Sequence, residues 1–177
     1  AVVNILSTTS SATIVGMNIG SAGKATGAVT VEALSGQQIL AIAGAVAAAP
    51  GGDATAVTVA ANVITAGAAA LLDNSDTHAA SLRVHAANSA GILAIAGGVG
   101  VSAGNNTAAA VAVNVIAGAA LPAIGPDTKA ENITQLTGTE SGCVDVSARV
   151  LNADLYLGAG GLDVLAEASS AILSIAA

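Results

Sequence analysis

The amino-acid sequence predicts an all-β fold, a β-solenoid of stacked short strands with an irregular insertion. Its 177 residues are 54 % hydrophobic, yet they include no Phe, no Trp and a single tyrosine, Tyr156. A core without aromatic side chains must be filled in a regular way by small and branched aliphatic residues. Long segments also recur, and in several of them large and small residues alternate with the period of a pleated strand.

The strongest of these signals is an internal repeat of roughly 50 to 60 residues, within the long end of known repeat periods. Three segments align without gaps, and each has Val-x-Ala, five intervening residues and then Ile-Leu-x-Ile-Ala, at 31–44, 84–97 and 164–177. A second block places an asparagine before two aliphatic residues, and it occurs at Asn4, Asn62 and Asn114. Repeats of this kind bury their apolar faces by stacking on one another.

The repeats predict a single solenoid domain, 1–177, divided at about 1–56, 57–110 and 111–177. The third repeat is longer, and we interpret its extra residues, 122–161, as a protruding insertion because they hold most charges of the C-terminal half. At a spacing of ~4.8 Å between stacked strands, the chain would make about seven to nine turns and a body roughly 35 to 45 Å long.

Alternation of side chains predicts which residues face the interior. We expect Val, Ile and Leu to fill a narrow core and Ala, Gly, Ser and Thr to cover the outside, so that Val113 is buried and Ala112 is exposed. The asparagines Asn4, Asn62 and Asn114 are expected to form a structural ladder inside the solenoid, each bonding to its own copies.

The charge of the chain excludes several kinds of partner. Only 8 % of residues are charged and the net charge is -7, with four basic residues, Lys24, Arg83, Lys129 and Arg149. So few cations cannot track phosphates, which excludes nucleic acid, nor dock the chain on anionic lipid. The uncharged stretches 54–72 and 86–126 are rich in small and polar residues and lack flanking cations, so we expect no membrane insertion.

Two strings resemble the repeats of very large bacterial surface proteins. Residues 92–102 (ILAIAGGVGVS) and 110–116 (AVAVNVI) are similar to repeats of filamentous-haemagglutinin-like adhesins, leukotoxin-type filamentous adhesins and autotransporter passengers. The resemblance covers about 1–120 and 161–177. It implies a right-handed parallel β-helix, export through the outer membrane, and a role as a structural segment of an extracellular fibre or cell-surface adhesin. It carries no catalytic residue.

The residues themselves predict no catalytic, cofactor or metal site. His78 and His85 lie near Asp73 and Asp76, but a metal needs three or four converging donors, so we interpret them as a solvated loop and an exposed strand residue. Residues 158–165 partly match the calcium-binding nonapeptide, which works in tandem copies, so this single copy predicts a Gly-rich turn.

Both ends of the chain stop inside a repeat without a polar cap, and solenoids need caps for solubility. We therefore expect a head-to-tail homopolymer in which open strand edges pair, with lateral bundling through low-charge Ala/Gly faces. Two alternatives stay open: a module that binds a host or cell-surface ligand through the 122–161 insertion, and a carbohydrate-active β-helix enzyme. The residues expected at the assembly contacts are Ala1, Val2, Val3, Asn4, Ile5, Leu6, Ile172, Leu173, Ser174 and Ile175.

Overall fold

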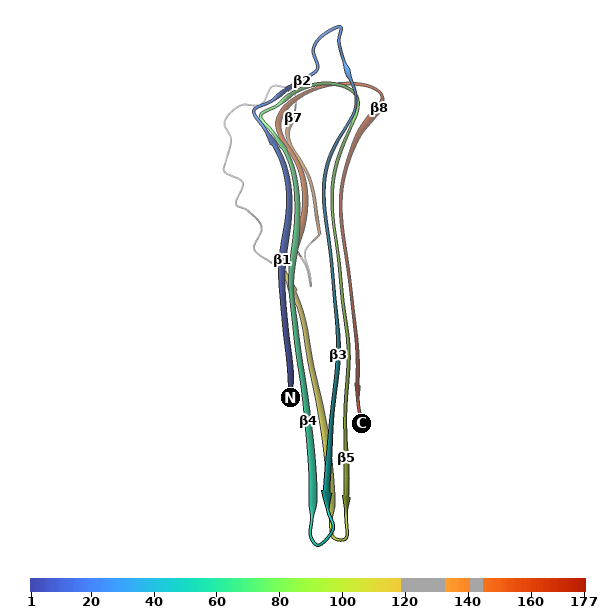
Figure 1. Ribbon diagram of the computed structural model, residues 1–177. Coiled ribbons are helices and arrows are strands. Elements are labelled where there is room, and N and C mark those ends of the chain that lie inside the picture. The colour runs from blue at the N-terminus through green and yellow to red at the C-terminus, as the bar shows by residue number, and fades with distance from the viewer. Residues whose placement is uncertain (119–132, 141–144) are drawn as a thin grey trace.

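The computed structural model describes residues 1–118, 133–140 and 145–177, and in these ranges the chain is all-β with no helix (Figure 1). Aliphatic and β-branched residues favour the pleated strand, and turn residues separate the runs. The strands are β1 (Val2–Val15), β2 (Asn18–Ile19), β3 (Thr26–Ala49), β4 (Ala54–Asp73), β5 (Asp76–Ser102), β6 (Asn106–Gly118), β7 (Ile133–Glu140) and β8 (Asp145–Ala176).

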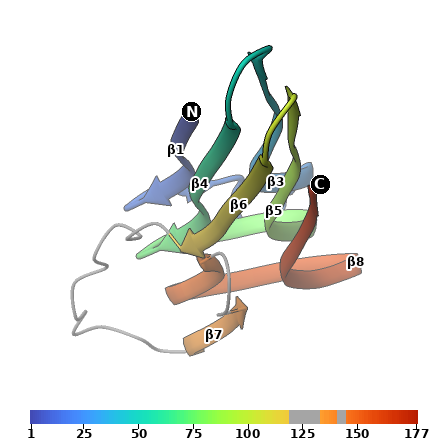
Figure 2. The same ribbon diagram turned by 90° about the horizontal axis from the view of Figure 1, so that it is seen from below.

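The strands form a curled, mainly parallel sheet with two facing sides. β1, β4 and β6 lie side by side on the first side, and β3, β5 and the C-terminal half of β8 on the second (Figures 1 and 2). The chain runs along one side and returns along the other, so β1 to β3 make a first coil, β4 and β5 a second, and β6 with β8 a third. The predicted all-β solenoid class is confirmed.

Each sequence repeat makes one whole coil, because the strands are long. Ile39 of β3 pairs with Ile92 of β5, and Ile92 pairs with Ile172 of β8, so the aligned segments lie in register. The 24 residues of β3 span about 80 Å at ~3.3 Å per residue. The prediction of short strands in seven to nine turns is therefore wrong, and the described chain makes three long coils.

The insertion is shorter than predicted. Ala66 of β4 pairs with Gly118 of β6, an offset of 52 residues, and the next residue, Gly67, pairs with Asp145 of β8, an offset of 78. The parallel ladder on β4 therefore continues from Gly118 directly to Asp145, without a missing position. Residues 145–161 belong to the stack, and the predicted bounds of 122–161 were wrong there. β7, within the inserted range, pairs antiparallel with the start of β8.

Equivalent corners of successive coils share one backbone conformation. Val15, Asp73 and Leu151 pair across the three coils, and the residue after each of them has a positive φ. These residues are Gly16, Asn74 and Asn152, with φ of 65°, 47° and 47°. Glycine and asparagine tolerate this left-handed conformation better than other residues. The Asn74 backbone N–H donates to the Leu151 carbonyl at 3.1 Å, which keeps the coils hydrogen bonded through the corner.

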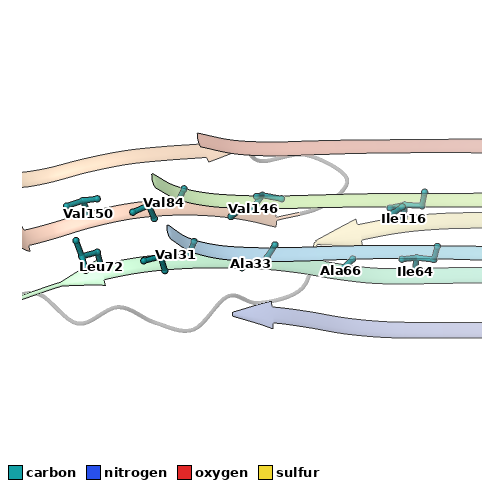
Figure 3. Packing of buried hydrophobic residues seen from close by; sticks show 14 of the residues in the cluster. Val31, Ala33, Ile64, Ala66, Leu72, Val84, Ile116, Val146 and Val150 are labelled. Atoms are coloured by element: carbon teal, nitrogen blue, oxygen red, sulfur yellow. The ribbon is translucent and has the colours of Figure 1, made fainter. Parts of the chain in front are cut away.

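One half of the molecule, which we call the wide half, buries large aliphatic side chains. It comprises residues 26–40, 64–93 and 145–170. Figure 3 shows such side chains pointing between the strands, and Leu72, Val84, Val146 and Val150 are all fully buried there. This is the aliphatic interior that the sequence predicted.

The other half, which we call the narrow half, comprises residues 41–63 and 94–115 and has the opposite arrangement. Its interior is lined by alanines such as Ala60 and Ala96, both 0 % exposed. Val113 is 51 % exposed, whereas Ala112 packs against the core. The prediction for this pair was wrong, because the two sides lie too close together here for large residues to face inward.

Candidate functional site: side-chain ladders and open strand edges

The two ends of the stack leave strand edges unpaired within the described residues. β1 pairs only with β4, and β3 only with β5, so the first coil has one free edge on each side. At the other end, β6 pairs only with β4, and the C-terminal half of β8 only with β5. β7 pairs with Val146–Ala153 of β8, on the edge of β8 that faces away from β4. The open edges of the third coil therefore lie mainly along β6 and the later part of β8.

The three asparagines singled out by the repeat form a continuous hydrogen-bonded ladder. Asn4 Nδ2 donates to Asn62 Oδ1 at 2.8 Å, and Asn62 Nδ2 donates to Asn114 Oδ1 at 2.8 Å. Asn114 Nδ2 donates in turn to the Ser174 hydroxyl, which belongs to the facing side. Asn62 is 0 % exposed, so its amide depends on these partners. The ladder has a direction, because every amide donates toward the third coil.

The expected assembly residues divide between the two faces of their strands. Val3 and Ile5 point outward and are 65 % and 73 % exposed, whereas the intervening Asn4 faces the interior. In the third coil, Ser174 accepts the hydrogen bond of the ladder. Of the remaining members, Ala1 is exposed, Val2 and Leu6 are half-buried, and Ile172, Leu173 and Ile175 are exposed.

Aliphatic side chains form further ladders on the outside of the second side. Leu40, Leu93 and Leu173 are paired in register, and the next outward row along the strands is Ile42, Ile95 and Ile175. Leu40 and Ile42 are each 66 % exposed. The outer surface of this region is therefore branched aliphatic, and not the Ala/Gly surface that the sequence predicted.

A charged cluster ties the three coils together on the outside of the wide half. His85 Nδ1 lies 2.9 Å from Glu32 Oε1, and His85 Nε2 lies 3.1 Å from Glu167 Oε2. A neutral imidazole has a single N–H, so it can donate to only one of these carboxylates at a time. Arg83 Nε lies 3.4 Å from Asp163 Oδ2 beside them. The expectation that His85 is exposed was wrong, since it is 7 % exposed.

The sequence contained a signal for this cluster. Glu32 and His85 occupy the same variable position of the Val-x-Ala blocks, and stacking in register brings them together. In the third copy, Leu165 pairs with His85, and Glu167 lies two positions after Leu165. Its approach to His85 depends on side-chain geometry, which the alignment of the repeats does not contain.

A groove of about 520 Å³ crosses the three coils beside this cluster. Its polar lining includes Ser35, Ser89, Ser169 and Glu167. Asn88 also borders it, but both amide atoms of Asn88 are buried and have no hydrogen-bond partner among the described residues. The groove therefore offers a ligand a few hydroxyls and one carboxylate.

The other residues considered for metal binding do not converge. His78 stacks on Tyr156 with ring centroids 4.3 Å apart, and its Nε2 lies 3.4 Å from Asp76 Oδ1. Asp73 accepts a hydrogen bond from Asn152. Over the part of the chain that the structure describes, no group of three or more His, Cys, Asp or Glu side chains could hold a metal ion.

The segment that resembles a calcium-binding nonapeptide is an irregularity of β8. The register between β5 and β8 shifts between Ala79 and Ser81, opposite the glycine-rich residues 158–161. A Cβ at Gly160 would lie 2.5 Å from the Ser81 Cβ, so only glycine fits this close approach. Asp163, the acidic residue of the motif, lies beside Arg83. The segment is thus strand with a bulge, and not the Gly-rich turn that was predicted.

Of the residues proposed for a ligand-binding insertion, 122–161, those at 122–132 and 141–144 lie outside the described residues, and they include Lys129 and Cys143. Of the described ranges, none contains a helix that is both long and apolar enough to cross a membrane. Comparison with known proteins found no matching family model, no matching curated protein and no matching solved structure.

Proposed function

We propose that this chain is a structural segment of an extracellular bacterial fibre or surface adhesin, that it assembles end to end by strand pairing, and that it is not an enzyme. The observation that carries the proposal is the repetition of whole coils in register between two ends with unpaired strand edges. Its extracellular and bacterial assignment rests on the resemblance of residues 92–102 and 110–116 to adhesin repeats.

Unpaired edges supply the attraction between copies. Each edge strand presents a row of backbone N–H and C=O groups that can pair with another strand. The first coil of one copy has the same strand directions as its own second coil, so it can lie on the third coil of another copy as a further parallel layer. Such a contact joins unlike surfaces and does not close, so it propagates as a filament.

The asparagine ladder favours this head-to-tail order. Among the described residues, Asn4 Oδ1 accepts no hydrogen bond, so the first coil ends the ladder with an acceptor. Asn114 carries two amide hydrogens and donates one to Ser174, so the third coil ends it with a donor. Stacking one copy on the next places donor beside acceptor and continues the ladder.

The charged groups of the described residues support a structural role. The cluster around His85 is occupied by its own contacts, since Glu32 and Glu167 face the two ring nitrogens and Asp163 faces Arg83. These contacts connect all three coils.

A pair of charges on the outer surface tests the stacking. Val3 and Val113 lie at the two ends of one ladder, separated in the single copy by Ala61, and both are exposed. End-to-end stacking would place Val3 of one copy directly beside Val113 of the next. We expect the double variant Val3→Lys/Val113→Lys to polymerise at least tenfold less than the unmodified chain, because like charges directly opposite each other on neighbouring strands repel.

The charge-complementary variant Val3→Lys/Val113→Glu is the matched control, and we expect it to restore polymer. Light scattering and electron microscopy measure the extent of assembly, and circular dichroism checks that each variant is folded. Equal polymer from both double variants would contradict the proposed contact, as would a monomeric unmodified chain at high concentration.

A further inference from the structure

We infer that the aliphatic outer face of the second side, in and beside the narrow half, docks on the same face of a second copy, so that filaments associate in pairs. This inference rests on the proposed end-to-end filament and specifies how filaments interact sideways. The face consists of the leucine row Leu40, Leu93 and Leu173 and the isoleucine row Ile42, Ile95 and Ile175.

The rows form an exposed apolar surface of a kind that soluble proteins usually cover. Leu40, Ile42 and Leu173 are 66 %, 66 % and 57 % exposed, and the rows lie next to each other on neighbouring outward positions. Contiguous apolar surface of this kind marks an interaction site, whereas single exposed aliphatic residues do not. End-to-end stacking would extend both rows along the whole filament.

The face also has a shape that fits its own copy. On the other side of the leucine row, the outward positions are Gln38, Gly91 and Ala171, and small residues at two of them leave a trough. A groove of about 380 Å³ runs along this trough and is bordered by Leu40, Leu93 and Leu173. A two-fold axis between two copies would place the leucine row of each in the trough of the other, which is an isologous contact.

Charge favours a second copy over other occupants. No Asp, Glu, Lys or Arg occurs in residues 33–52, 86–118 and 168–177, which hold the parts of β3, β5 and β8 that form the face. The face therefore offers nothing to a charged partner and no cations to anionic lipid. It also has no aromatic side chain on which a sugar ring could stack. A surface of the same neutral, aliphatic character is its best complement.

The size of the face explains why docking would depend on the filament. Five residues along β3 (38–42), with three strands ~4.8 Å apart, give a flat area of roughly 240 Å² per copy. Stable pairwise interfaces bury about 800 Å² per partner, so two isolated copies would associate weakly. In stacked copies many such faces act together, and each contact after the first is effectively intramolecular.

The test is the single variant Leu40→Lys, with Val57→Lys as the matched control. Both replace an exposed aliphatic residue with lysine, and Val57 lies on the inner strand β4, outside the proposed face and on the opposite side of the molecule. Both changes also reduce the net negative charge of the chain, which by itself favours association. Loss of pairing in Leu40→Lys alone would therefore be specific.

Electron micrographs would measure filament width. We expect paired filaments from the unmodified chain and from Val57→Lys, and a fall of more than about tenfold in the paired fraction for Leu40→Lys, because the contact would bury an uncompensated charge. A second variant, Gly91→Val, fills the trough and should also give single filaments. A Cβ at Gly91 meets only Gln38 Cγ, at 3.9 Å, so the coil itself has room for it.

The outcomes separate the two proposals. Single filaments from the unmodified chain, or paired filaments from Leu40→Lys, would overturn the lateral contact and leave end-to-end assembly standing. Absence of any polymer from the unmodified chain would overturn both. Flotation of the unmodified chain with neutral phosphatidylcholine vesicles, lost in Leu40→Lys, would assign the face to lipid and overturn the second copy as its occupant.

Discussion

The wide and narrow halves of the molecule bury opposite kinds of side chain, although the same strands run through both. In the wide half, Leu72 and Val84 face inward and are fully buried. In the narrow half, Ala60 and Ala96 face inward, and Val113 faces solvent. Alternation along a strand therefore identifies two faces without telling which one is the core. The distance between the two sides decides that.

Close approach of the two sides is visible in contacts of the narrow half. A Cβ placed at Gly98 would lie 3.3 Å from the carbonyl oxygen of Ala56 on the facing side, which is tighter than usual. Thr58 Oγ1 donates to the Gly97 carbonyl across the same gap at 2.8 Å. Only Gly, Ala and an occasional small polar residue fit such a space. The larger aliphatic residues of these strands must then point outward.

The largest expected difference between the two halves comes from placing an aspartate on a strand of each, because only one of the two charges would be buried. We expect Val84→Asp to prevent folding, because its carboxylate would enter the aliphatic interior of the wide half without a partner. Val113→Asp should change the free energy of unfolding by about 0.5 kcal/mol or less, since the residue is half exposed. Circular dichroism and urea titration would measure both. Comparable damage from the two variants would refute the assignment of the narrow half.

An intermediate effect is expected from enlarging neighbouring alanines. Ala60 faces the interior beside Ala43 and Ala96, whereas Ala61 faces outward between Val3 and Val113. We expect Ala60→Leu to destabilise the fold by about 1–3 kcal/mol, because overpacking forces the two sides apart. Ala61→Leu should be nearly neutral. Urea midpoints give the comparison, and a tolerated Ala60→Leu would mean that the two sides can separate freely.

Much of the fold could be predicted from repetition alone. The aligned Ile-Leu-x-Ile blocks gave the partners of Ile39, Ile92 and Ile172, because identical sequences stack in parallel register. The asparagine blocks likewise placed Asn4, Asn62 and Asn114 on one line. Like residues recurring at a fixed spacing are a direct signal of neighbours in a solenoid.

Other features depend on distances that the sequence does not contain. The repeat length did not show whether one repeat makes one coil or several, so strand length and the number of coils were predicted wrongly. The approach of Glu167 to His85 requires two long side chains to reach across a row. The sequence predicted that the exposed leucine and isoleucine rows belong to the core, because alternation along a strand does not show which of its two faces points inward. A hydrophobic pattern alone favours burial.

The smallest effect is expected at the boundary between the two halves, where residues 119–144 leave the stack. β6 ends opposite Ala66 and β8 begins opposite Gly67, so the ladder on β4 continues without a missing position. Deleting 119–144 and joining Gly118 directly to Asp145 should therefore give one uninterrupted strand. It would remove β7 together with its antiparallel pairing to β8, and shorten the connection from β6 to β8, whose closure entropy depends only weakly on length. Loss of the β7 pairing destabilises the fold and the shorter connection stabilises it, so we expect the free energy of unfolding to shift by no more than about 1 kcal/mol.

The matched control is a deletion one residue longer, 119–145, which joins Gly118 to Val146. It moves the buried Val146 one position along β4, from its partner Ala68 to Gly67, and shifts β8 against β4 by one residue. That control should lose much of its β-structure by circular dichroism, because a slip of an odd number of residues turns inward side chains outward. If the in-register deletion were as damaging as the control, residues 119–144 would be part of the structural unit, and the boundary between the halves would need the insertion to form.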